Sequence, residues 1–156
     1  MKRVLFSMVL LMAVSFSFAQ MKNVKEAKSM ANDVKPNFKQ AEQLIMEAMK
    51  NPETMVLADT WDVAGYIQRR INEEQMKNAF LKKPYDTLKV YNSNLKMYEN
   101  YNKCDELAEI PNEKGKVKNK YRKANASSML AERPNLINGG IQYFNLDKNK
   151  EALKFF

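Results

Sequence analysis

The stretch RPNLINGGIQYFNLDKNKEALKFF, residues 133–156, decides the fold that we predict for this chain. It places Gly139 and Gly140 beside an aromatic pair inside a pattern that is otherwise helical. Glycine has no side chain, so two helices can approach closely there while aromatic rings a turn away fill the flanking space. A second, short helix is predicted from about Lys148 to the end of the chain. We therefore expect helical hairpins whose two helices lie close together.

The composition of the chain favours helices and excludes several classes of catalytic site. The 156 residues are 45% hydrophobic and 28% charged, with four glycines and five prolines. An all-β chain needs more turn residues than this, and a disordered chain contains fewer apolar residues. Histidine is absent and Cys104 is the only cysteine, so Ser-His-Asp, Cys-His, zinc-finger and disulfide-framework sites all lack a required residue. We expect one all-α domain without a cofactor or a metal site.

The first residues have the features of a cleaved export signal. Lys2 and Arg3 precede an apolar run over residues 4–18, and Ser17 and Ala19 are the small residues that a signal peptidase recognises. The run is shorter than the roughly 20 apolar residues that a membrane-spanning helix needs. We predict a signal peptide at 1–19 with cleavage before residue 20. The mature protein is then periplasmic or extracellular and has no stable membrane span.

The basic charge of the chain does not indicate binding to nucleic acid. The formal net charge is +8, and the densest basic cluster is KGKVKNKYRK at 114–123. This cluster contains no base-stacking or groove-reading motif, and an exported protein is separated from nucleic acid. We interpret the cluster as a solvated segment that follows an irregular connection at about 109–118.

Prolines divide the mature chain into successive helical patterns, in which apolar residues repeat at three and four positions. A first helix is predicted from Val24 to Val34. A second is predicted over residues 38–49, with Asn37 as its cap. The link between them is short, so these two helices are expected to be antiparallel neighbours. A third helix is predicted over residues 57–80.

The fourth predicted helix, residues 88–108, has two apolar faces. One face consists of Leu88, Tyr91, Leu95 and Tyr98, and the other of Val90, Met97, Tyr101, Cys104 and Ala108. A helix with two apolar faces must touch two neighbours, as the inner members of a stacked array do. The next pattern runs from about Val117 to Phe144 and contains Pro134. We favour one helix kinked at this proline over two separate helices, because a single helix preserves the antiparallel alternation.

These patterns resemble the tetratricopeptide repeat (TPR) family. Its hairpins carry a Trp or large apolar residue, a small residue, Gly and an aromatic on the first helix, then a small residue and an aromatic on the second. In the last segment the matching residues are Leu136, Gly139, Gly140, Tyr143, Ala152 and Phe156. In the third helix they are Trp61, Ala64 and Gly65, with Gln68 where an aromatic is usual. The resemblance implies a short right-handed solenoid of stacked antiparallel hairpins over residues 20–156.

The chain departs from the family pattern in two places. Gly65 and Gly140 lie 75 positions apart, whereas two repeats of about 34 residues would separate them by about 68. The last repeat, 133–156, is incomplete and ends on Phe155 and Phe156 rather than on a helix with a polar outer face. We therefore expect a C-terminally truncated member of an exported bacterial repeat family, able to self-associate through this uncapped end. The alternative is that the two aromatics are buried in a complete small core.

The resemblance also implies a binding site. Residues that face the concave groove of the family correspond here to Asp59, Asp62, Tyr66, Arg69, Arg70, Ile137, Ile141, Phe144 and Asn145. On this basis we expect a non-enzymatic interaction or scaffold module of the bacterial cell envelope that binds a protein or peptide. The basic clamp of chaperone-binding members is not reproduced, because Asp62 and Tyr66 stand where Lys and Asn are expected. For Arg69 and Arg70 the alternative is a solvated face or an ion pair with Glu73 or Glu74 at helical spacing.

Two other functions remain open from the sequence. A carboxylate-dependent hydrolase would need two acidic side chains that converge. Glu73 and Glu74 are adjacent and point apart, and Asp59 and Asp62 share a face at the solvated start of a helix, so we do not predict an enzyme. A structural part of a larger exported assembly is the third possibility, and the sequence does not separate it from a binding module.

Overall fold

The computed structural model describes residues 21–111 and 113–156 of the chain. Within these ranges the regular structure is entirely helical and contains no strand, so the predicted all-α class is confirmed there. The predicted signal peptide and its cleavage site lie outside the described residues. Throughout the described ranges, every helix is too short or too polar to cross a membrane.

The N-terminal part of the molecule consists of three helices around one core. Residues 21–32 are helical, and α2 (Phe38–Lys50) and α3 (Ala58–Phe80) follow. The side chain of Asn37 accepts the backbone N–H of Gln40 at 3.2 Å, so the predicted cap of α2 is confirmed. The core residues from the three helices are Val24, Ala27, Ala31, Ala41, Ile45, Ala48, Val63, Ala64, Ile67 and Ile71. Val34 does not join them, because Pro36 disfavours helical geometry at Lys35 and the first helix ends before this point.

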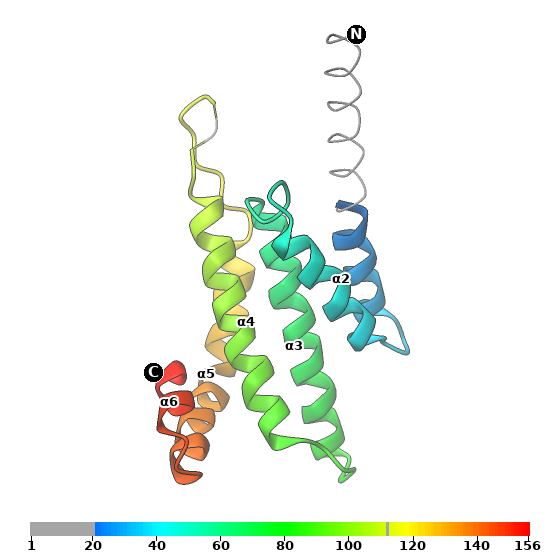
Figure 1. The fold of residues 1–156 in the computed structure, drawn as a ribbon, viewed down its shortest axis with the longest axis vertical. Helices are drawn as coiled ribbons and strands as arrows, with labels where there is room; N and C mark the ends of the chain where they lie inside the picture. Colours follow the sequence, from blue (N-terminus) through cyan, green and yellow to red (C-terminus); the bar gives the residue numbers. More distant parts are fainter. Residues whose placement is uncertain (1–20, 112) are drawn as a thin grey trace, which may run out of the picture.

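The long antiparallel pair α3 and α4 (Thr87–Ala108) occupies the centre of the molecule (Figure 1). Gly65 of α3 faces the ring of Tyr101 on α4. A Cβ atom at position 65 would overlap the Cδ1 and Cε1 atoms of that ring and would lie 3.1 Å from its Cγ. Glycine at this position therefore allows the two helices to reach their observed separation.

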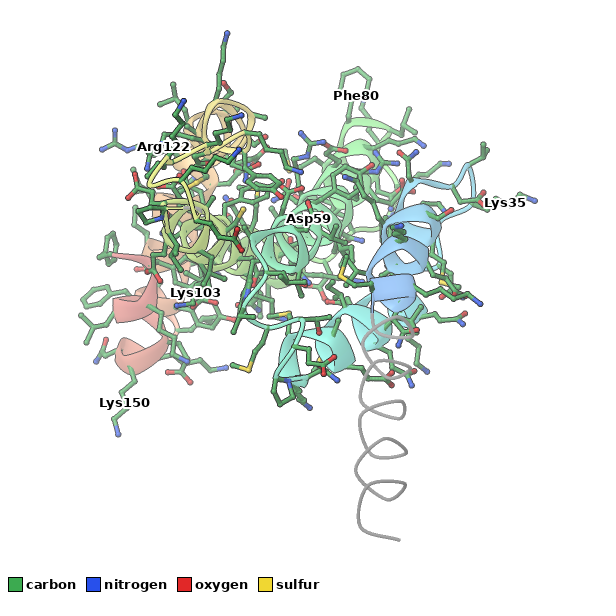
Figure 2. All side chains as sticks on the ribbon, turned by 90° about the horizontal axis from the view of Figure 1, so that it is seen from above. Lys35, Asp59, Phe80, Lys103, Arg122 and Lys150 are labelled. Atoms are coloured by element: carbon green, nitrogen blue, oxygen red, sulfur yellow. The ribbon has the colours of Figure 1, made fainter. Side chains whose placement is uncertain are left out.

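The two predicted faces of α4 are confirmed by their neighbours. Val90, Met97, Tyr101 and Cys104 are buried, with Tyr101 against α3. Leu88, Tyr91 and Leu95 pack against the next elements, α5 (Arg122–Asn145) and α6 (Asn149–Ala152). The elements thus follow one another across the molecule in sequence order, from the N-terminal helices to α6, as the end-on view also shows (Figure 2).

The helix α5 continues through Pro134, which confirms the preferred interpretation of this segment as one helix. It begins at Arg122, however, and not near Val117. The reason is local, because Oδ1 of Asn119 accepts the N–H groups of Tyr121 and Arg122 at 3.1 and 3.0 Å. These bonds satisfy the N–H groups of the residue before α5 and of its first residue, which have no partner within the helix.

The C-terminal hairpin closes over the glycine pair of α5 through α6 and a 3-10 turn, η1 (Leu153–Phe155). A Cβ atom at Gly139 would lie 2.8 Å from Cδ1 of Phe155, and one at Gly140 would lie 2.5 Å from Cζ of Phe156. Phe155 stacks on Tyr143 with ring centroids 5.5 Å apart and is only 5% exposed, whereas Phe156 is 78% exposed. The expectation that both aromatics are free for self-association is therefore wrong for Phe155, and only Phe156 offers its ring to a neighbour.

We predict that Gly65→Ala destabilises the protein by a net of about 1–2 kcal/mol. The added methyl group would overlap the Cδ1 and Cε1 atoms of the buried Tyr101 ring, so its overpacking cost is in the upper part of the usual range, about 2–3 kcal/mol. The gain of about 1 kcal/mol in helix propensity offsets part of this cost. For a chain of this size the melting temperature should fall by roughly 2–10 °C, measured by circular dichroism. The double variant Gly65→Ala with Tyr101→Leu should lose less than the sum of the two single changes, because leucine leaves room for the methyl group. A single variant as stable as the original chain would contradict the proposed role of Gly65.

Candidate functional site

Two of the candidate residues on α3, Asp59 and Asp62, are bound by the first turns of α5. The hydroxyl of Tyr121 donates to Oδ1 of Asp59 over 2.6 Å, and Nδ2 of Asn125 donates to Oδ1 of Asp62 over 3.1 Å. The ammonium of Lys120 lies 3.6 Å from Asp59. Both carboxylates thus help to hold α5 against α3.

The other α3 candidates, Tyr66, Arg69 and Arg70, also have partners within the chain. The hydroxyl of Tyr66 donates to Oδ1 of Asn32 over 2.7 Å, and Nε of Arg70 donates to a backbone carbonyl of the first helix over 3.3 Å. Both arginines pair with Glu73, at 3.4 Å from Nε of Arg69 and 2.7 Å from Nη1 of Arg70. The interpretation of the two arginines as ion-pair partners of Glu73 is therefore confirmed.

The candidates on α5 lie on an exposed face. Ile137, Ile141, Phe144 and Asn145 are all exposed, and they follow Pro134. By contrast, α3 contacts the part of α5 that precedes this proline. It binds Tyr121 and Asn125 as described above, and Nη1 of Arg69 donates to the hydroxyl of Ser128 over 3.3 Å. The structure thus places the two groups of candidates along different parts of α5 and does not bring them together in one groove.

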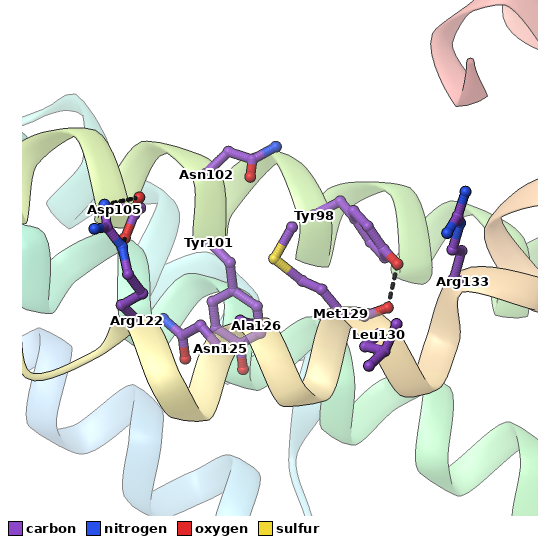
Figure 3. A pocket seen from close by; sticks show the side chains of 10 residues that line it. All are labelled: Tyr98, Tyr101, Asn102, Asp105, Arg122, Asn125, Ala126, Met129, Leu130 and Arg133. Carbon is purple, nitrogen blue, oxygen red and sulfur yellow. Dashed lines mark hydrogen bonds and ion pairs between the residues drawn. The ribbon is translucent and has the colours of Figure 1, made fainter.

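A hollow of about 460 Å³ opens between α4 and the first half of α5 (Figure 3). Its walls are formed by Tyr98, Tyr101, Asn102, Asp105, Arg122, Asn125, Ala126, Met129, Leu130 and Arg133. The hydroxyl of Tyr98 donates to the backbone carbonyl of Met129 and so joins the two helices across the hollow. The centre of the hollow is apolar, with an arginine near each end of its α5 side. We call it the α4–α5 hollow.

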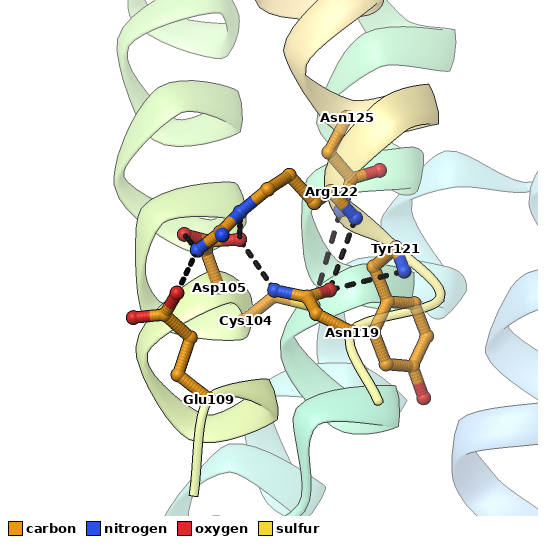
Figure 4. A network of polar contacts seen from close by, with 7 residues as sticks. All are labelled: Cys104, Asp105, Glu109, Asn119, Tyr121, Arg122 and Asn125. Carbon is orange, nitrogen blue, oxygen red and sulfur yellow. Dashed lines mark hydrogen bonds and ion pairs between the residues drawn. The ribbon is translucent and has the colours of Figure 1, made fainter. Parts of the chain in front are cut away.

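One end of the α4–α5 hollow is fixed by a polar network (Figure 4). The guanidinium of Arg122 donates to both oxygens of Asp105, at 3.0 and 2.7 Å, and also pairs with Glu109. Nδ2 of Asn119 donates to Asp105 over 2.6 Å. The hydrogen bond from Arg122 lowers the pKa of Asp105; burial opposes this shift, and the bond from Asn119 adds to it. The network ties the end of α4 to the start of α5.

Burial controls the ionisation of two α4 side chains at the hollow, Tyr101 and Cys104. It raises the pKa of the Tyr101 hydroxyl well above its usual range and that of the Cys104 thiol to about 12. The carboxylates of Asp62 and Asp105 act in the same direction on Cys104. Both groups therefore stay protonated at neutral pH, and Cys104 is not an activated thiol.

The carboxylates and the cysteine do not gather into a metal site or a catalytic pair in the described part of the chain. Across residues 21–111 and 113–156, no group of three or more Asp, Glu or Cys side chains could hold a metal ion. Asp59 and Asp62, the pair considered for hydrolysis, each accept a hydrogen bond from α5. Nothing in the geometry of these residues favours hydrolysis over a structural role.

Sequence reasoning did not identify the α4–α5 hollow. Tyr98 and Tyr101 were assigned to different apolar faces of α4, and Leu130 and Arg133 were not part of the pattern predicted for the following helix. The available signal was the three-residue spacing of the two tyrosines, since residues three apart are neighbours on a helix surface. Two such rings define a continuous wall only when a second helix lies beside them, and that helix comes from a distant part of the sequence.

We predict that Asp105→Asn lowers the melting temperature at neutral pH, because the amide cannot form the charged pair with Arg122. Since the pKa of Asp105 is lower in the folded protein, its stabilising effect is present above the unfolded value, about 3.9, and is lost as the pH falls through the folded pKa. The difference in melting temperature from the original chain should therefore shrink below about pH 4. Glu106→Gln, which removes a solvent-exposed pair with Lys103 on the same helix, serves as the control and should change little. A difference that is independent of pH would contradict the charged pair.

Comparison with known proteins supplies no relative for this chain. No protein-family model, no curated protein and no solved structure matches it. The function is therefore inferred from the contacts and exposed surfaces of α3, α4 and α5.

Proposed function

We propose that this chain is a non-enzymatic binding module of the cell envelope that holds a protein or peptide on the outward face of α5. One observation carries the proposal, an apolar stripe that follows α5 at helical spacing. The residues of this α5 stripe are Leu130, Pro134, Ile137, Ile141 and Phe144, all exposed. Leu130 is 70% and Phe144 63% exposed, and no charged residue occurs from position 134 to position 146.

The α5 stripe is not needed for the packing of α5 itself. The opposite side of the helix carries Gly139, Gly140 and Tyr143, which are buried against the C-terminal hairpin and α4. Apolar residues that repeat every three or four positions without a covering element are typical of a helix that receives a partner. The sequence candidates Ile137, Ile141 and Phe144 belong to this stripe, and Asn145 lies at its edge.

We also propose that the helices stack as a short TPR-like solenoid. The support is a contact that occurs in both hairpins: a glycine on the first helix faces an aromatic ring on the second. Gly65 faces Tyr101 in the central hairpin, and Gly139 faces Phe155 in the last one. In such a stack the α5 stripe lies on the first-helix face, where the family binds its partners. The α3 candidates would contribute less to partner binding, because their side chains already form hydrogen bonds and ion pairs within the chain.

A second proposal is that the chain is part of a larger exported assembly. It is favoured by Leu153 and Phe156, which are both exposed at the C-terminal hairpin. These two side chains would provide a docking surface apart from the α5 stripe, and self-association through them would make the apparent mass depend on protein concentration.

We predict that Ile141→Ser with Phe144→Ser removes partner binding without unfolding the chain, because both side chains are exposed. Purified protein would be immobilised and incubated with an envelope extract, and the retained proteins would be compared by quantitative mass spectrometry. A specific partner should decrease at least tenfold with the double variant. The matched control is Phe80→Ser, which removes an exposed aromatic from the end of α3 and should leave retention unchanged.

The proposal would be wrong if the double variant retained the same proteins as the original chain. It would also be wrong if Phe80→Ser caused the same loss, since apolar exposure alone would then explain the binding. Size-exclusion chromatography of each variant shows whether self-association accounts for any difference.

We predict that export removes the first 19 residues. Mass spectrometry of the mature protein should find residue 20, Gln20, at the N-terminus, because Ser17 and Ala19 provide the small residues of the cleavage site. Ala19→Leu should block cleavage, since a large side chain does not fit the peptidase, whereas Ala13→Leu, within the apolar run, should not. Recovery of the protein with Met1 intact from the envelope would contradict this prediction.

A further inference from the structure

Two residues that line the α4–α5 hollow each have a polar atom without a partner in the described part of the chain. Tyr101 is 3% and Asn125 8% exposed, and both line the hollow. Within the described residues, the Tyr101 hydroxyl has no hydrogen-bond partner and the amide oxygen of Asn125 receives no donor; the Asn125 nitrogen donates to Asp62 and Cys104. Neither atom is among the fully buried atoms that lack a partner, so solvent reaches both, and a ligand in the hollow can replace water as their hydrogen-bond partner.

The two arginines of the hollow differ in their charge balance. Arg122 is neutralised by Asp105 and Glu109. By contrast, no carboxylate of the described residues lies within ion-pair distance of Arg133, which is exposed at the other end. In a chain with a net charge of +8, this guanidinium is a site for an anionic group, and a carboxylate matches its planar donors best.

The spacing of these groups indicates the size of the ligand. Asn125 and Arg133 are eight positions apart on α5, or about 12 Å at 1.5 Å per residue. An extended peptide advances about 3.3 Å per residue, so roughly four residues cover this distance. A single amino acid is too short to reach both ends. The volume of about 460 Å³ is within the range of small-ligand sites and accommodates one large side chain with part of its backbone.

A path also leads from the hollow to the α5 stripe. Leu130 and Arg133 border a second, shallower hollow of about 390 Å³, whose other walls are Pro134, Ile137 and Asn138. A peptide that lies along the stripe can therefore continue past Arg133 into the α4–α5 hollow.

We propose that the α4–α5 hollow binds an extended peptide segment that carries an acidic residue about four positions from a large apolar residue. The acidic side chain pairs with Arg133, and the apolar side chain lies against Tyr101 and Ala126, at the Asn125 end of the hollow. A backbone N–H of the segment donates to Asn125, and a backbone carbonyl accepts the Tyr101 hydroxyl. This inference rests on the proposed function, and it adds a charge and length requirement that the α5 stripe alone does not impose.

The test uses four synthetic pentapeptides, acetylated and amidated at their ends. Two have Glu and Phe at the terminal positions, in either order, with three alanines between them, and two have Gln in place of Glu. Binding to the full mature chain is measured by the change in protein NMR shifts on titration. At least one Glu peptide should bind no less than tenfold more tightly than its Gln counterpart.

Four variants locate the binding. Arg133→Gln should remove the preference for Glu over Gln, whereas Lys123→Gln, which removes an exposed charge from the same helix, should preserve it. Ala126→Trp should block both peptides by filling the hollow from an exposed position. Tyr101→Phe should weaken binding several-fold without lowering the melting temperature, since the hydroxyl has no partner to lose.

The proposal is overturned if neither Glu peptide binds at millimolar concentration, or if Arg133→Gln leaves the preference intact. It is equally overturned if Ala126→Trp does not affect binding. The Ile141→Ser, Phe144→Ser variant separates this outcome from that of the proposed function. Loss of the envelope partner in that variant, together with failure of the peptides, would support the stripe and reject the hollow.

Discussion

The contact between Gly65 and Tyr101 is the constraint on which the arrangement of the other helices depends. The ring of Tyr101 occupies the space where any other residue at position 65 would place its Cβ atom. It thereby sets the separation of α3 and α4 and also reaches the wall of the α4–α5 hollow. Because the opposite face of α4 carries Leu88, Tyr91 and Leu95, the position of α4 in turn determines where α5 and α6 can pack.

Polar side chains then fix the position of α5 against α3 and α4. Asp59 and Asp62 bind Tyr121 and Asn125 in its first turns, and the Asn119 side chain determines where the helix begins. Each of these hydrogen bonds contributes little net stability. Because hydrogen bonds are directional, they fix the register of α5, which non-directional apolar contacts alone would not. The same contacts use the side chains that a groove on α3 would need for a partner. The binding surface that we propose is therefore on α5, where exposed apolar side chains are not covered by another element of the described chain.

Much of the fold could be predicted from the sequence because its signals are local. Proline positions and the three- and four-residue spacing of apolar side chains gave α2, α3 and α4 to within one or two residues, and they gave the two faces of α4. The predicted start of α5 was wrong, because the apolar spacing of Val117 and Tyr121 does not reveal that the Asn119 side chain binds the backbone N–H groups of Tyr121 and Arg122. The burial of Phe155 rather than Phe156 depends on the 3-10 turn at the chain end. The α4–α5 hollow could not be predicted, since it exists only between residues that are distant in sequence.

Pro134 divides α5 between two neighbours, and this has a consequence for the stability of its parts. Proline has no N–H, so the carbonyl of Leu130 lacks its usual helical donor and the continuity of hydrogen bonds along α5 is interrupted there. Residues before the proline are held by α3 and α4, and those after it mainly by α6, η1 and the N-terminal half of α4. The C-terminal hairpin can therefore open as a local unit while the central pair stays folded, so its amide protons exchange with solvent sooner. A partner that lies across Leu130 and Ile137 would bridge this boundary and make the two units unfold together.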